Sequence, residues 1–215
     1  PSTEPSGIFR DPSKWSLSSM HSIPIGYEIS ATPLQIAMSY AAIANGGFLL
    51  KPYVVEKIEK YDDTIIKNQR NTKKRILSQS NAEKLKSMLT YTVEHGSGKQ
   101  AYISGWNVAG KTGTSKKLVD GKYSEDQFRS SFVGFFPQEN PQLLCLIIID
   151  NPDASRNLHW GSISAAPVFK SVMDRVINID KSITISRSKK EKNTNEPILI
   201  QKNFDRKIEY VKMPN

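Results

Sequence analysis

Residues 108–116 read Val-Ala-Gly-Lys-Thr-Gly-Thr-Ser-Lys, and this stretch decides how the rest of the sequence is interpreted. Side chains alternate across a β-strand, so in an extended backbone Lys111 and Gly113 point to one face while Thr112 and Thr114 point to the other. The lysine supplies a fixed positive charge, the hydroxyls are hydrogen-bond donors, and the glycine lets another backbone lie close. These features predict an anion-binding strand edge. An ordinary exposed polar strand and a phosphate-binding loop are the alternatives.

A nucleotide-binding loop has a second candidate in residues 95–100, His-Gly-Ser-Gly-Lys-Gln, which also place a glycine before a lysine. The Walker pattern requires a glycine five residues before its Gly-Lys pair, and Ser or Thr directly after the lysine. Val93 and Gln100 occupy these two positions, and a predicted helix precedes the segment instead of following it. The sequence therefore argues against nucleotide binding.

Length and composition indicate a globular chain, because 215 residues with 38% hydrophobic and 24% charged residues are enough to bury a core. The longest apolar run, residues 143–149, is far shorter than the ~20 residues that span a bilayer, and no signal peptide opens the sequence. Because the sequence starts at Pro1 without a methionine, we expect it to be a piece of a longer protein.

The formal net charge of +9 is concentrated near the C-terminus, where residues 181–215 hold nine Lys/Arg against four Asp/Glu. The rest of the chain is only mildly basic. No stripe of aromatic residues is interleaved with the basic ones, which favours a solvated tail over a nucleic-acid groove. We therefore expect no nucleic-acid partner.

One cysteine and three histidines leave little room for metal or redox chemistry. Cys145 lies in an apolar, strand-like run, which predicts a buried structural thiol and excludes an intrachain disulfide. His21 and His95 are expected to be structural or exposed. The histidines are scattered without metal-ligand spacing, so we predict no metal and no cofactor.

Two capping sequences each predict the start of a helix. Residues 32–35, Thr-Pro-Leu-Gln, form a capping box that predicts a helix to about Asn45, ended by Gly46 and Gly47. This helix is apolar nearly all round, which predicts a central position. Residues 80–83, Ser-Asn-Ala-Glu, form another capping box and predict a second helix that Gly96 ends. Residues 1–29 are rich in Pro, Ser and Gly and predict loops with short helical pieces.

Three strands are predicted over residues 107–116, 128–136 and 143–150, and the turn-rich residues 137–141 join the last two. This order predicts an antiparallel meander. The phenylalanines of the second strand occupy both odd and even positions, so their side chains point to both faces of the sheet. We therefore expect helices on both faces, with a last helix over residues 164–177 covering one of them.

Five blocks occur together in one order, and their sequences resemble the transpeptidase domain of class B penicillin-binding proteins, with the division-associated enzymes most similar. The resemblance covers about residues 25–177 and implies an α+β fold of the penicillin-binding and serine β-lactamase type, in which helices flank an antiparallel sheet. The blocks are GYEISATPLQ (26–35), AAIANGG (41–47), VAGKTGTSKK (108–117), SSFVGFFP (130–137) and AAPVF (165–169).

The resemblance also implies a mechanism, because this family uses an S-x-x-K nucleophile box, an S-x-N box and a K-T-G box. Only the K-T-G box is present in a credible place. The single literal S-x-x-K match, residues 186–189, falls in the basic linker. We therefore expect the serine and its lysine to lie upstream of Pro1. By resemblance, Lys111 supplies the positive field, Thr112 and Thr114 contact the substrate carboxylate, and the Thr114 N–H forms half of an oxyanion hole. Gly113 would keep room for the peptide.

The implied activity is a peptidoglycan D,D-transpeptidase that crosslinks stem peptides through an acyl-serine intermediate and is acylated by β-lactams. A D,D-carboxypeptidase or β-lactamase of the same fold is one alternative, and a non-catalytic module that binds cell-wall peptide or partner proteins is another. The resemblance further implies partners in cell-wall synthesis or division. It also implies an N-terminal membrane anchor, with the domain on the extracytoplasmic side of the cytoplasmic membrane.

Residues 159–162, His-Trp-Gly-Ser, depart from the pattern of an aromatic residue and a glycine pair that is common in the family, so we assign no function to His159 or Trp160. The predicted organisation has three parts. Residues 1–179 are the C-terminal part of a transpeptidase domain and residues 180–196 a basic polar linker. Residues 197–215 are either the start of a PASTA-like module, which residues 210–215 resemble, or a tail.

Overall fold

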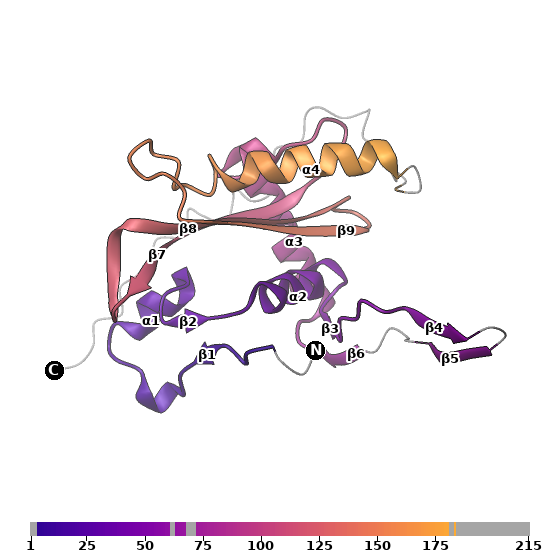
Figure 1. Ribbon diagram of the computed structural model, residues 1–215, viewed down its shortest axis with the longest axis horizontal. Coiled ribbons are helices and arrows are strands. Elements are labelled where there is room, and N and C mark those ends of the chain that lie inside the picture. Colours follow the sequence, from indigo (N-terminus) through magenta and orange to yellow (C-terminus); the bar gives the residue numbers. More distant parts are fainter. Residues whose placement is uncertain (1–3, 61–62, 68–71, 181–182, 184–215) are drawn as a thin grey trace. The chain divides into compact units, whose positions relative to one another are not determined.

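A computed structural model describes residues 4–60, 63–67, 72–180 and 183 (Figure 1). Residues 1–185 belong to one compact unit. The predicted linker, apart from Asp180 and Ile183, and the predicted terminal module or tail lie outside the described residues. Those two boundaries therefore stay predictions.

The Lys-Thr-Gly-Thr stretch lies on β7 (Ala109–Val119), the first strand of a three-stranded antiparallel sheet (Figure 1). β8 (Lys122–Phe136) pairs with both β7 and β9 (Leu143–Asp150). This order confirms the predicted meander. In the described sheet β7 and β9 are the two edge strands, so one side of β7 does not pair with a neighbouring strand.

The first two strands are longer than predicted, because they continue into a hairpin closed by Asp120 and Gly121. These residues have φ angles of 49° and 77°. Positive φ at both central residues is what a tight hairpin turn requires, and Asp-Gly is a favoured sequence for it. The prediction missed this signal. Near the turn, the ring of Tyr123 packs edge-on against Tyr27, with centroids 5.4 Å apart, so the hairpin contacts the segment that leads into α2 (Pro33–Ala44).

Helices cover both faces of the sheet, as predicted. On one face α4 (Ala165–Ile179) packs Phe169 against Phe132 and Phe136. On the other face, Ala109 and Phe135 pack with residues of α2 (Pro33–Ala44) and α3 (Gln79–His95). Alternate residues of β8 therefore belong to two different cores.

The cap of α2 agrees with the sequence, whereas that of α3 differs. Thr32 caps α2 in a complete capping box with Gln35. The last helix, predicted over residues 164–177, is α4 and begins at Ala165. The cap of α3 is Ser78 and not Ser80, because Ser78 is extended and its hydroxyl accepts from the N–H of Asn81 at 3.2 Å. The predicted capping box at residues 80–83 is therefore wrong. Its serine lies inside the first helical turn.

The predicted central position of α2 holds in part, since the helix contacts β8, β9 and α3 but only Ala42 and Ala44 among its residues are buried. After α2, residues 48–60 contain two strands with different partners. β3 pairs with β6 and β4 pairs with β5, while β1 pairs with β2 near the N-terminus. The remaining elements are β1 (Ile8–Phe9), η1 (Pro12–Lys14), α1 (Ser19–Ser22), η2 (Ile23–Ile25), β2 (Ile29–Ser30), β3 (Phe48–Leu50), β4 (Lys57–Lys60), β5 (Asp63–Lys67), β6 (Thr72–Arg75) and η3 (Lys99–Ala101).

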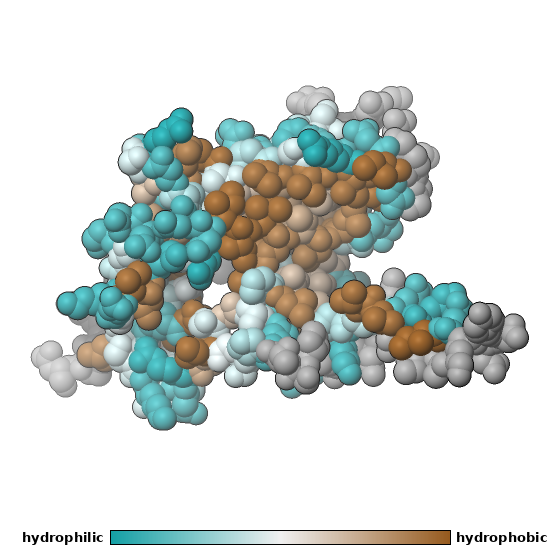
Figure 2. Space-filling view, in the orientation of Figure 1, coloured by the Kyte–Doolittle hydropathy of each residue, from teal (hydrophilic) through white to brown (hydrophobic). Residues whose placement is uncertain are grey.

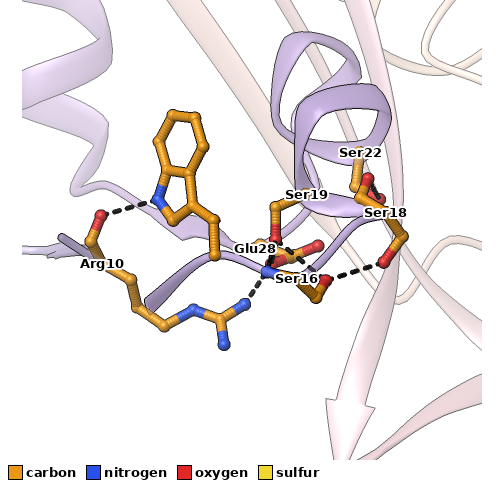
Figure 3. Close-up of polar contacts among 7 residues, drawn as sticks. Arg10, Ser16, Ser18, Ser19, Ser22 and Glu28 are labelled. Atoms are coloured by element: carbon orange, nitrogen blue, oxygen red, sulfur yellow. Dashed lines mark hydrogen bonds and ion pairs between the residues drawn. The ribbon is translucent and has the colours of Figure 1, made fainter. Parts of the chain in front are cut away.

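A polar cluster holds Glu28 in a left-handed conformation just before β2 (Figure 3). Its φ is 61°, which a residue with a side chain adopts rarely. The carboxylate pairs with Arg10 and accepts from the buried Ser19 hydroxyl at 2.8 Å, and Ser19 in turn contacts Ser16. These contacts fix the loop that leads into α2.

Asp150 ties the three strands of the sheet together. Its carboxylate accepts from Lys117 of β7 at 3.0 Å and from Arg129 of β8 at 3.1 Å. The hydrogen bond from Lys117, aided by the positive charges of Lys117 and Arg129, holds the pKa of Asp150 below its usual value. A lowered carboxyl pKa stabilises the fold above the pKa of the unfolded chain, and this stability is lost as the pH falls through the folded pKa.

We predict that Asp150→Asn lowers the melting temperature slightly at pH 7, because exposed ion pairs contribute little. The difference from the parent chain should shrink on acidification and vanish once Asp150 is protonated. Melting curves at pH 7 and pH 3 by circular dichroism measure it. A difference that stays constant with pH would show that the carboxylate charge is not responsible.

An apolar surface gathers over β9 and the adjoining side of α4 (Figure 2). Residues 143–149 of β9 are all apolar and only half-buried, and Val168 and Val172 of α4 are exposed. Exposed apolar surface of this kind favours association with another apolar surface. Within the described ranges, no helix combines the length and hydropathy that crossing a membrane requires.

Candidate active site

The exposed edge strand β7 separates the lysine from the threonines, as its alternation predicts. Lys111 shares a face with Ala109, which packs toward α2 and α3. Its side chain is exposed, and its Nζ donates to the carbonyl oxygen of Thr112 at 2.8 Å. Thr112 and Thr114 are half-buried on the face that α4 covers, since their cross-strand partners are Phe132 and Ser130. The cation and the hydroxyls thus approach one strand edge from two sides.

The hydroxyl of Thr112 contacts a residue from another element. Ser97 Oγ lies 2.7 Å from Thr112 Oγ1, and either hydroxyl can be the donor. Ser97 belongs to the glycine-rich loop that follows α3, which sequence analysis rejected as a nucleotide site and left without a function. Whichever way the hydrogen bond runs, the pair keeps one O–H group available for a ligand.

The hydroxyl of Thr114 is an acceptor for a backbone group. The N–H of Gly161 donates to Thr114 Oγ1 at 3.0 Å. Gly161 lies in the connection between β9 and α4, far from Thr114 in the sequence. Because the bond uses a lone pair of Thr114, the hydroxyl hydrogen remains free to be donated elsewhere.

The missing side chain of Gly161 allows this close approach. A Cβ on Gly161 would lie 2.5 Å from the carbonyl oxygens of both Gly113 and Ser131, so the backbone of residue 161 rests directly on β7 and β8. A Cβ on Gly113 would lie 2.4 Å from Ser131 Oγ on the opposite face. The backbone of residue 161 therefore lies close to Gly113. That Gly113 also keeps room for a substrate peptide stays a prediction.

His159 and Trp160, to which the sequence assigns no function, directly precede Gly161, whose N–H contacts Thr114. The His159 ring stacks on Phe128 with centroids 4.4 Å apart and lies 4.7 Å from the ring of Trp160, which is half exposed. The carbonyl oxygen of His159 accepts a hydrogen bond from the buried Ser130. The contacts of His159 with Phe128 and Ser130 join segments distant in sequence, so no local pattern indicates them.

No nucleophile with an activating partner accompanies these groups in the part of the chain that the structure describes. In that part no serine hydroxyl is hydrogen-bonded to a lysine amine, and no three His, Cys, Asp or Glu side chains form a metal-binding group. Cys145 lies on β9, at the opposite edge of the sheet, and burial raises the pKa of its thiol, which disfavours a thiolate. His21 and His95 are exposed, in agreement with the sequence. The site therefore offers charge and hydrogen bonds toward an anion.

Comparisons with known proteins agree with this geometry. Residues 2–174 match the family described as "Penicillin binding protein transpeptidase domain". The chain is 34% identical over 150 residues to Stage V sporulation protein D of Bacillus subtilis, an alignment that covers 69% of the chain and 23% of that protein. It is also 34% identical over 170 residues to the peptidoglycan D,D-transpeptidase FtsI homolog of Mesostigma viride, with 73% and 28% covered.

A solved structure extends the agreement to the fold. Penicillin binding protein 3 from Mycobacterium tuberculosis, complexed with aztreonam, superposes with a TM-score of 0.72 at 26% identity. The superposition covers 84% of this chain and 42% of that one. The chain thus spans less than half the length of each of these three proteins.

A K-T-G strand at the edge of an antiparallel sheet flanked by helices is a feature of the α+β class that contains the penicillin-binding proteins and serine β-lactamases. The match to the transpeptidase domain family covers most of the sequence. The chain belongs to the penicillin binding protein transpeptidase domain family. Both the predicted resemblance and the predicted fold class are confirmed.

Proposed function

We propose that the β7 edge binds the C-terminal carboxylate of a peptidoglycan stem peptide and that the chain supplies this half of a D,D-transpeptidase site. The observation that carries the proposal is that Lys111 and two hydroxyl groups meet at the β7 edge. Thr114 keeps its O–H hydrogen for a ligand, and the hydrogen-bonded pair of Thr112 and Ser97 also keeps one O–H hydrogen for it. Hydrogen bonds to a carboxylate from such groups are charge-assisted and therefore strong. A relative named as a D,D-transpeptidase and a neighbour bound to a β-lactam support it.

In the proposed reaction, a serine hydroxyl outside this sequence attacks the carbonyl carbon of the penultimate D-alanine. The peptide bond breaks, the terminal D-alanine leaves as the amine, and an acyl-serine ester remains. An amine of a second stem peptide then attacks the ester, which forms the crosslink and frees the serine. Lys111, Thr112 and Thr114 hold the leaving residue's carboxylate. The N–H of Thr114 stabilises the oxyanion that develops in both steps.

The wider context follows from the same proposal. The intact protein would be anchored in the cytoplasmic membrane, with this domain on the extracytoplasmic side, and would work with other proteins of cell-wall synthesis or division. Transfer of the acyl group to water, as in a carboxypeptidase or β-lactamase, would use the same carboxylate site. A binding module without a nucleophile would use it too.

The binding step can be tested on the 215-residue chain. We predict that an acetylated Lys-D-Ala-D-Ala peptide with a free carboxylate binds about tenfold more tightly than its C-terminal amide, because hydrogen bonds to charged groups are the stronger ones. Titrations followed by ¹⁵N NMR should shift the amide signals of residues 111–115. Lys111→Met should remove most of the preference for the carboxylate.

Lys122→Met is the matched control, because it removes an exposed lysine from the far end of the same hairpin. It should leave the preference for the carboxylate unchanged. Equal affinities of the parent chain for the two peptides would refute the proposed carboxylate site. Signal shifts confined to residues away from β7 would also refute it.

A further inference from the structure

Residues 159–161, which we call the strap, are attached to the sheet by two hydroxyls that face each other. Ser130 on β8 donates to the carbonyl oxygen of His159, and Thr114 on β7 accepts from the N–H of Gly161. Thr114 and Ser130 are direct cross-strand partners. The strap therefore crosses β7 and β8 at the position of the proposed carboxylate ligand.

The position of the strap is closely defined by packing. Ser130 is fully buried, and Gly161 lies so near the sheet that a Cβ would meet two backbone oxygens at 2.5 Å. The stacking of His159 on Phe128 holds the other end. A buried hydroxyl that loses its acceptor is costly, so the hydrogen bond from Ser130 resists any shift of the strap away from β8.

This attachment determines what the Thr114 hydroxyl can do. A threonine hydroxyl has one hydrogen and rotates freely unless a partner fixes it. The Gly161 N–H occupies an acceptor position, so the hydrogen of Thr114 is directed to other acceptors, and a carboxylate at the edge of β7 is one. Without the strap, the hydroxyl is free to turn and bond elsewhere, and binding must then pay for reorienting it.

We propose that Ser130 is a positioning residue that acts through the strap to hold Thr114 ready to donate to the substrate carboxylate. The inference rests on the proposed function, because it concerns the same carboxylate site. Ser130 itself is fully buried beneath the strap, so a ligand at the β7 edge would not contact it. Its effect is therefore specific to ligands with a carboxylate.

The test compares the two peptides, free carboxylate and amide, on variants of the full 215-residue chain. Ser130→Ala should weaken binding of the carboxylate peptide about five- to tenfold, the size expected for one hydrogen bond, and leave the amide peptide unaffected. Ser130→Thr keeps a hydroxyl and should restore most of the loss. Gly161→Ala, whose Cβ displaces the strap, should reproduce the selective loss.

Ser155→Ala is the matched control, because it removes a serine that bonds to Asp153 within the same connection and away from the strap. It should bind both peptides like the parent chain. If Ser130→Ala weakens both peptides equally, or neither, Ser130 is merely structural and the inference is wrong, whatever the melting temperature. A parent chain without preference for the carboxylate would instead overturn the proposed function, and the inference with it.

Discussion

Replacing Phe132 by alanine should lower the free energy of unfolding by about 3–5 kcal/mol, the range for large aromatic residues in a core. The side chain is fully buried, and its ring lies 4.8 Å from that of Phe169, centroid to centroid. This contact joins β8 to α4. Urea denaturation followed by circular dichroism measures the change.

The packing around Phe132 explains why little relaxation is expected. A Cβ on Gly110 would lie 2.5 Å from the ring, and a Cβ on Gly134 would lie 2.9 Å from it. The ring thus fills space that these two glycines leave open on β7 and β8. Without it, the cavity is bordered by backbone that cannot move without breaking the strand pairing that also places Lys111 and Thr114.

Phe9→Ala is a suitable control, because it removes the same side chain from an exposed position that contacts Trp15. We expect a loss below about 1 kcal/mol there. If the two variants lose equal free energy of unfolding, Phe132 does not belong to the core that stabilises the sheet.

Local signals explain which elements could be predicted from the sequence. The box formed by Thr32 and Gln35, and the Gly46-Gly47 stop, act within one helical turn and gave α2 nearly residue by residue. The apolar run of β9 also predicts both ends of that strand correctly, at residues 143 and 150. The start of α3 was misplaced because Ser78 and Ser80 both satisfy the local rule for a cap. The backbone conformation that distinguishes them is visible only in the fold.

The candidate site was predicted only as far as its strand. The alternation of Lys111 and the threonines follows from strand geometry, and family resemblance suggested their function. The contacts of Thr112 with Ser97 and of Thr114 with Gly161 join residues 15 and 47 positions apart. Such contacts depend on how α3 and the β9–α4 connection pack against β7, and no periodicity or spacing encodes that packing.

Incubation of the 215-residue chain with a fluorescent penicillin should leave no labelled band on a denaturing gel. Acylation requires a nucleophilic oxygen activated by a nearby base, and a covalent label persists only if that bond forms. At the β7 edge the described residues supply the cation of Lys111 and the hydroxyl groups of Thr112 and Thr114. Among the described residues, no serine hydroxyl is bonded to a lysine. The only S-x-x-K sequence, residues 186–189, lies outside them in the predicted linker.

The decisive comparison is with a chain that also carries the predicted upstream S-x-x-K and S-x-N boxes, treated in the same way. We expect that longer protein to be labelled, and Lys111→Met within it to label far more slowly, because the positive field that holds the carboxylate is gone. A labelled band from the 215-residue chain would mean that its nucleophile has been overlooked. An unlabelled longer protein would favour the non-catalytic binding module, since the carboxylate site would then serve recognition without acyl transfer.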